Sequence, residues 1–232
     1  MDRRNFLRAV ALSGAAFAIK DTDAMSVMTQ SFAADGKVAT KYDLVAVMGG
    51  EPEVMFRKAI AEMGGMGKFI KKGDKVVVKP NIGWDKIPEL AANTNPKLVA
   101  EIVEQCFKAG AKEVTVFDHT CDDWRKCYKN SGIEAAAKAA GANVVPADQG
   151  SYYKPVSLPN GKKLTKTQIH ESIVNCDKWI NVPVLKNHGG AQLTISMKNY
   201  MGIVWDRGFF HANDLQQCIA DVCTYEKRPV LN

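Results

Sequence analysis

Two stretches of sequence decide the fold: KVVVKPN at residues 75–81 and WINVPVLKNHGG at residues 179–190. Each begins with an apolar, β-branched run of strand length and ends in lysine and asparagine. Similar runs occur at residues 44–48, 113–118 and 143–146, and segments of helical periodicity lie between them. Strands that alternate with helices predict an α/β domain, in which a largely parallel sheet is flanked by helices.

The expected elements follow from these periods. We expect strands at residues 44–48, 75–79, 113–118, 143–146 and 178–183, and helices at residues 53–63, 96–109, 133–140, 193–203 and from a cap at Asn213 to Val222. The helix at 96–109 has the clearest signals, because Asn95 and Pro96 favour its start and Gly110 its end. Prolines and glycine at residues 151–164 predict a small β excursion. The apolar residues after Pro229 predict another buried strand, so we expect a C-terminus truncated inside the domain.

Composition excludes several classes of protein. The 232 residues carry a formal net charge of +6, and this basic excess is spread along the chain rather than clustered, which argues against a nucleic-acid track. The longest apolar run, residues 9–19, is shorter than the about 20 residues that a spanning helix needs. We therefore expect no transmembrane span in the mature chain. The motifs of metalloproteases and of serine hydrolases do not occur.

The N-terminus has the pattern of an export signal. Arg3 and Arg4 precede Asn5, Phe6-Leu7 and Arg8, as in twin-arginine signals, and a mild apolar stretch follows. Small residues around Ala33 suggest cleavage before Ala34. We therefore predict a signal peptide at residues 1–33, a folded domain at residues 34–232, the twin-arginine (Tat) export machinery as a partner, and a periplasmic or other extracytoplasmic location. An amphipathic first helix is the alternative.

Six cysteines are far apart and form no C-x-x-C pair. The spacing of ferredoxin-type clusters is therefore absent, and we expect no intrinsic 4Fe–4S cluster in this chain. Some of the cysteines could pair in an exported protein, but sequence does not choose among the connectivities.

Polar residues follow two predicted strands at their carboxyl ends. Lys79 and Asn81 follow one strand, and Asp118 and His119 follow another. In open parallel sheets ligands collect at this edge, where a lysine can hold an anion and an acidic residue beside a histidine suits metal or proton chemistry. The alternatives are a solvated lysine in a turn and an aspartate that caps the next turn.

The end of a third strand is the richest. Lys186 and His188 precede Gly189-Gly190, and the helix expected next carries Thr194 and Lys198 on one face. This pattern predicts a cradle for a carboxylate or phosphate, and the alternative is a tight turn before a helix with a basic outer face. The whole predicted site comprises His188, Lys186 and Lys198 as catalytic groups and Lys79, Asn81, Asp118, Thr194, Asn199, Arg207 and His211 as ligand-binding groups.

Three motifs together resemble one family. They are KPN at residues 79–81, GAKEVTVFD at residues 110–118 and PVLKNHGGAQLTISMKNYMG at residues 183–202. From about residue 43 onward the chain is similar to the domain of unknown function 362 (DUF362) family, whose biochemical role is not established. The resemblance implies an architecture distantly similar to that of nickel-pincer lactate racemases, in keeping with the Rossmann-like layers expected of the alternating strands and helices, and frequent twin-arginine signals. Some relatives carry an added iron–sulfur module, whose cysteine runs this chain lacks.

Three functions stay open at this point. The first is an exported protein that binds a small anionic molecule or a metal-bound cofactor with the ten residues named above. The second is a redox accessory protein that works with an iron–sulfur partner or module. The third is a noncatalytic solute-binding module. The sequence identifies no cofactor or metal, and it does not decide whether the protein is an enzyme.

Overall fold

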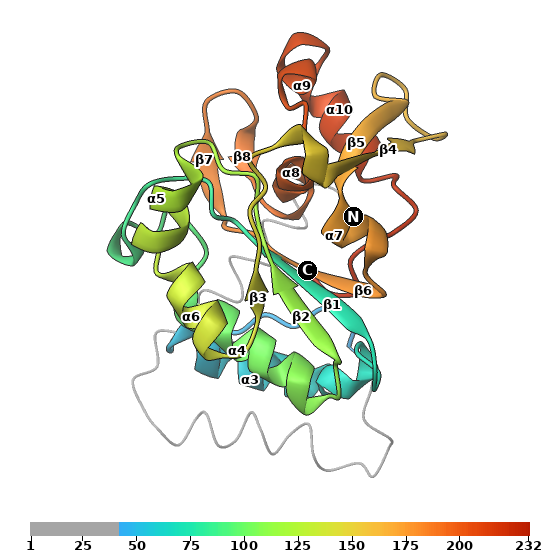
Figure 1. The fold of residues 1–232 in the computed structure, drawn as a ribbon. Coiled ribbons are helices and arrows are strands. Elements are labelled where there is room, and N and C mark those ends of the chain that lie inside the picture. Colours follow the sequence, from blue (N-terminus) through green and yellow to red (C-terminus); the bar gives the residue numbers. More distant parts are fainter. Residues whose placement is uncertain (1–41) are drawn as a thin grey trace, which may run out of the picture. The chain divides into compact units, whose positions relative to one another are not determined.

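A computed structural model of the chain describes residues 42–232 (Figure 1). The signal predicted at residues 1–33 and the domain boundary at residue 34 lie outside this range. Within it, no helix has the length and the apolar character needed to cross a membrane.

The centre of the described region is a four-stranded sheet in the order β3-β2-β1-β6. Its strands are β1 (Lys75–Pro80), β2 (Glu113–Val116), β3 (Asn143–Val144) and β6 (Lys178–Val182), and all three pairings are parallel. The predicted α/β class with a parallel sheet is therefore confirmed. Beyond β6, Leu231 forms a parallel bridge to Ile180, so the apolar residues after Pro229 do join the sheet.

Alternate side chains of the strands enter two hydrophobic cores. Val76 and Val78 face the core that α3 (Pro52–Glu62), α4 (Pro96–Lys108) and α6 (Ile133–Ala139) cover. Val77 and Trp179 face the other core. Burial on both faces explains why these strands read as continuous apolar runs rather than as alternating ones.

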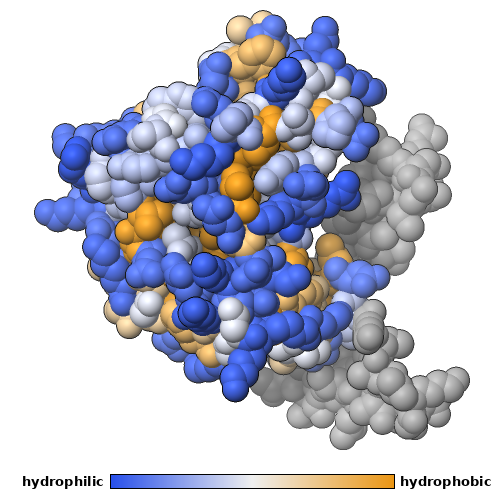
Figure 2. All heavy atoms as spheres, turned by 45° about the vertical axis from the view of Figure 1, so that its right-hand side comes forward, coloured by the Kyte–Doolittle hydropathy of each residue, from blue (hydrophilic) through white to orange (hydrophobic). Residues whose placement is uncertain are grey.

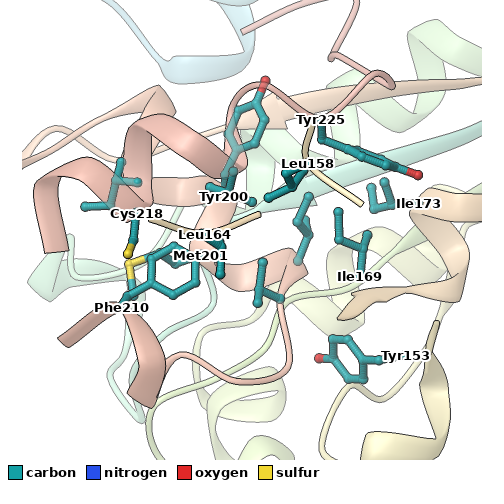
Figure 3. Packing of buried hydrophobic residues seen from close by; sticks show 14 of the residues in the cluster. Tyr153, Leu158, Leu164, Ile169, Ile173, Tyr200, Met201, Phe210, Cys218 and Tyr225 are labelled. Carbon is teal, nitrogen blue, oxygen red and sulfur yellow. The ribbon is translucent and has the colours of Figure 1, made fainter. Parts of the chain in front are cut away.

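The second core is closed by elements from the later half of the chain. They are β4 (Tyr153–Ser157), β5 (Lys166–His170), α7 (Glu171–Asn175) and α10 (Leu215–Val222), and β4 pairs with β5 in antiparallel register. Figure 3 labels Leu158, Leu164, Ile169 and Tyr200 among the buried residues of this core. The β excursion predicted at 151–164 is present, but its ladder continues to His170.

Local signals set the ends of α4 as expected. The Asn95 side chain accepts a hydrogen bond from the backbone N–H of Lys97 at 2.9 Å, and Pro96 occupies the first turn. After the helix, Gly110 has φ +99°, a conformation that a side chain would strain.

Three expected elements differ in the structure. Residues 44–48 form no strand, and Leu44 and Met48 are exposed. The last helix begins after Asp214, and its cap is Asp214 rather than the expected Asn213. The Asp214 carboxylate accepts from Gln217 N at 3.2 Å, whereas the Asn213 amide donates to Phe209 O in α9 (Gly208–Ala212).

The largest correction concerns the helix expected at 193–203. The chain reverses over residues 189–191, and Gln192 has φ +61°, so that β7 (Lys186–His188) pairs with β8 (Gln192–Thr194) in a hairpin. Only then come the short α8 (Ser196–Asn199) and a 3₁₀ helix (Tyr200–Ile203). The helix α5 (Trp124–Asn130) and shorter 3₁₀ helices at Met66–Lys68, Pro88–Leu90 and Gly150–Tyr152 were not among the expected elements.

The surface agrees with a domain whose apolar residues are mostly inside. Figure 2 shows one face covered largely by hydrophilic residues, with hydrophobic residues visible in patches between them.

Candidate functional site

The centre of the candidate site is a buried ion pair between neighbouring strands. Lys79 lies near the carboxyl end of β1, and Asp118 follows β2, so parallel pairing brings them together. The distance from Lys79 Nζ to Asp118 Oδ1 is 2.8 Å, and the two side chains are 1% and 2% exposed. Burial lowers the pKa of Lys79, while the charge of Asp118 opposes this shift.

Asparagines complete the bonding of the pair. Lys79 Nζ also donates to Asn199 Oδ1 at 2.8 Å, and Asn199 Nδ2 donates to Asn181 Oδ1 at 2.8 Å. The second oxygen of Asp118 accepts from the backbone N–H of Ile82 at 2.7 Å. The buried ammonium therefore has the partners that burial requires, whereas Asp118 Oδ1 has the ion pair with Lys79 but no hydrogen bond among the described residues.

Gly202 covers this ion pair. A Cβ atom at this position would overlap Asp118 Oδ1 and lie 2.5 Å from Lys79 Nζ. No residue with a side chain fits there unless the pair moves, so the glycine is required by close approach.

A cavity of about 380 Å³ lies at this carboxyl end of the sheet. Its lining residues are Lys79, Asn81, Gly83, Trp84, Asp118, His119, Cys121, His188, Lys198, Asn199, Met201, Gly202, Arg207, Gly208 and His211. A smaller pocket of about 60 Å³ shares seven of these residues, among them Asn81, His188 and Lys198, and adds Lys186 and Thr194. The structure thus brings all ten residues of the predicted site to the walls of two adjoining pockets, which we call the carboxyl-end cavity.

The ten residues do not all face a ligand in the same way. Lys79 bonds to both Asp118 and Asn199, whereas Thr194 donates to the carbonyl of Val184 at 2.8 Å, next to the β7–β8 hairpin. Thr194 lies on β8, so the prediction that it shares a helix face with Lys198 was wrong. Gly189-Gly190 likewise forms the hairpin turn and not a helix N-terminus.

Three cationic groups remain on the walls of the cavity. Lys186 Nζ donates to Asn81 Oδ1 at 2.8 Å, whereas Lys198 Nζ has no hydrogen bond or ion pair with any residue in the range 42–232. Burial lowers the pKa of both lysines, and Arg207 lowers that of Lys198 further. Of the residues that line the two pockets, only Asp118 carries a carboxylate, and Lys79 already pairs with it. The cavity therefore has a positive excess.

Arg207 also holds the segment after Asp118. Its guanidinium donates to the carbonyls of His119 at 2.9 Å and Thr120 at 2.6 Å, and Nη1 lies 3.6 Å from Cys121 Sγ. Cys121 is exposed. Sequence reasoning singled out His119 only as the neighbour of Asp118, and it missed Cys121, Trp84 and Gly202, because their closeness to the site is tertiary.

Two histidines on the cavity wall have opposite tautomers. His188 Nδ1 accepts from the backbone N–H groups of Gly190 at 3.1 Å and Ala191 at 3.0 Å, so the proton of the neutral ring is on Nε2. His119 Nδ1 lies 2.9 Å from the carbonyl oxygen of Val204, which can only accept, so its Nε2 carries a lone pair. Burial lowers the pKa of each ring, which favours the neutral forms.

Metal ligands are not clustered in the described range. Residues 42–232 contain no group of three or more His, Cys, Asp or Glu side chains placed to hold a metal ion. All six cysteines lie in this range, and none is in a disulfide.

Fold and site together define an α/β domain with a positively charged polar cavity at the carboxyl end of a parallel sheet. Residues 76–232 match the family described as a domain of unknown function (DUF362), and the chain belongs to this family. The predicted family is therefore confirmed.

Two known proteins are similar to this chain. The thylakoid-associated protein sll1697 of Synechocystis is 29% identical over 148 residues, which are 64% of this chain and 44% of the relative. The chain thus spans less than half the length of that relative. The lactate racemase apoprotein from Thermoanaerobacterium thermosaccharolyticum has a TM-score of 0.45 and 15% identity, covering 68% of this chain and 38% of its own.

Proposed function

We propose that the carboxyl-end cavity binds a small anion, such as a carboxylate or a phosphate, in a protein exported by the Tat pathway. The observation that carries this proposal is the positive excess of the cavity. Lys186, Lys198 and Arg207 line its walls, and the one carboxylate there already pairs with Lys79. Because the site is partly removed from water, cations there attract an anion more strongly than on an open surface.

The residues divide into a framework and a binding wall. Lys79, Asp118 and Asn199 hold the strand ends in place, since their polar atoms bond to one another. Lys198 and Lys186 would neutralise the anion, and Asn81 orients Lys186. Neutral His188 would donate from Nε2, which suits it to stabilise developing negative charge or to deliver a proton. Arg207 and His211 would contact the ligand at the mouth.

A metal-bound cofactor is compatible with the same wall only if the cofactor brings ligands of its own. Lysine ammonium groups repel a bare cation, and the described residues provide no three-ligand cluster. An anionic carrier of a metal would meet the same lysines as a free anion. Electron exchange with an iron–sulfur partner stays a prediction.

Calorimetric titration of the full chain with inorganic phosphate and with acetate tests the anion site. We expect Lys198→Gln to weaken binding by about tenfold or more, because it removes a charged hydrogen-bond donor from a partly buried wall. The matched control is Lys138→Gln, which lies on α6 in an exposed pair with Glu134. Equal affinities of Lys198→Gln and the unaltered chain would contradict the proposal.

Export is tested independently by the double substitution Arg3→Lys and Arg4→Lys. Cell fractionation should find the unaltered protein outside the cytoplasm and beginning at Ala34, and the double variant retained inside. Lys20→Arg, which keeps the charge outside the motif, is the control. Export of the double variant at the unaltered level would contradict a twin-arginine signal.

A further inference from the structure

The lone pair of His119 distinguishes this cavity from a simple cluster of cations. Nδ1 must donate to Val204 O at 2.9 Å, because a carbonyl offers no proton, so Nε2 of the neutral ring is an acceptor. The ring is also held in orientation by Trp205, with centroids 5.3 Å apart and planes 5° apart. His119 therefore presents a fixed acceptor rather than a ring that turns to suit its ligand.

The acceptors in the interior of the cavity other than His119 are already in use. Asp118 accepts from Ile82 N and pairs with Lys79, Asn199 Oδ1 accepts from Lys79, and Asn81 Oδ1 accepts from Lys186. Among the wall groups that remain for a ligand, Lys198, Arg207 and the Nε2–H of His188 are donors. His119 Nε2 is thus one acceptor among cationic and neutral donors.

From this arrangement we infer that the cavity selects oxyanions that carry a proton, such as hydrogen phosphate and its monoesters, over aprotic oxyanions of equal charge, such as sulfate. The inference rests on the proposed anion site and names its ligand class. A protic anion can accept from the lysines, Arg207 and His188 with its oxygens, and it can donate its hydroxyl to His119 Nε2.

Sulfate lacks that donor. Bound in the same place, it sets an oxygen lone pair against the lone pair of His119, and a hydrogen bond available to phosphate is not made. Protonation of His119 would relieve the conflict, but burial and the neighbouring Arg207 both lower the pKa of this ring. The selectivity therefore comes from an unmatched acceptor and not from the total charge.

The test compares calorimetric dissociation constants of inorganic phosphate and sulfate for the full chain, at a pH where phosphate is mainly the dianion. Charge is then equal for the two probes. We expect phosphate to bind about tenfold more tightly than sulfate, the usual consequence of leaving a buried acceptor unpaired.

Two variants assign this preference. In His119→Asn the amide nitrogen takes the position of Nδ1, which keeps a donor for Val204 O while Nε2 is lost, so the two affinities should become equal. Lys138→Gln, at an exposed residue of α6 outside the cavity, is the control and should keep the preference.

Each outcome decides between the two proposals. Equal binding of phosphate and sulfate by the unaltered chain contradicts the selectivity but not the anion site. An undiminished preference for phosphate in His119→Asn has the same consequence. Binding of neither probe overturns both. If His119→Asn does not fold, nitrogen NMR of the unaltered chain decides, since a protonated Nε2 in neutral His119 contradicts the inference.

Discussion

Lys79 and Lys198 line the same cavity, yet their surroundings are opposite. Lys79 is fully buried and bonds to Asp118 and Asn199, whereas Lys198 is half-buried and has no polar partner in the described range. A charge that is completely satisfied by the protein has little left to offer a ligand. The comparison therefore separates a framework, which determines stability, from a wall, which is free to bind.

Asp118→Ala should have the largest effect on the framework. It leaves the ammonium of Lys79 buried without its carboxylate, and breaking such a pair costs about 3–5 kcal/mol of folding free energy. Urea unfolding of both proteins measures the difference. Glu134→Ala, which breaks the exposed pair with Lys138, is the control and should cost about 0.5 kcal/mol or less. A loss for Asp118→Ala no larger than for this control would remove the distinction between framework and wall.

Gly202→Ala should have the next largest effect. The added methyl group overlaps Asp118 Oδ1, so the ion pair or the 3₁₀ helix must shift, and overpacking of this kind costs about 1–3 kcal/mol. Thermal unfolding measures it against Gly67→Ala, where a Cβ atom meets nothing within 4 Å. Equal stability of the two variants would show that the cover over the pair is loose.

The affinity of the cavity for an anion should depend on pH, and Lys198→Arg should change this dependence. Burial lowers the pKa of Lys198 below the ordinary value of 10.5, so anion affinity should fall as pH rises through that lowered pKa. Arginine keeps its charge, and its affinity should persist to higher pH. Phosphate titrations over a series of alkaline pH values compare the two profiles. Superimposable profiles would mean that Lys198 does not carry the charge that the anion meets.

Lys198→Gln should have the smallest effect on stability. Removing a half-buried charge that lacks a partner should leave the free energy of unfolding unchanged or increase it, a gain in stability, by up to about 0.5 kcal/mol. Urea unfolding checks this beside the loss of anion binding expected of the same variant. A clear destabilisation would place Lys198 in the framework with Lys79.

Sequence periodicity predicted an element well where its own apolar pattern determines the element and its apolar side packs on the sheet. The strand at residues 75–80 and the helix at residues 96–108 were predicted within one residue at each end. It was a poor guide at residues 193–203, where a helix was predicted although Leu193, Ile195 and Met197 alternate with polar residues, a period that favours a strand. A β7–β8 hairpin forms there instead, in which Gln192–Thr194 pair across to Lys186–His188.

The site could be predicted as a set of residues but not as a mechanism. Lys79 and Asp118 end neighbouring strands, so parallel pairing places them at one edge once the sheet exists. That they neutralise each other depends on a 2.8 Å contact under Gly202, about 80 residues further along the chain. No local pattern in the sequence states such a distance.

By itself the sequence determined the α/β class, the family and the residues that gather at the carboxyl end of the sheet, because buried parallel strands need long apolar runs and leave their polar residues at the ends. Only the tertiary structure decided which lysine pairs with a buried carboxylate, which lysine stays unpaired, and which nitrogen of His119 and His188 holds the proton. Those outcomes depend on partners that are distant in sequence or on the exact turn of a hairpin, and a hydrogen bond exists only where both partners are in place.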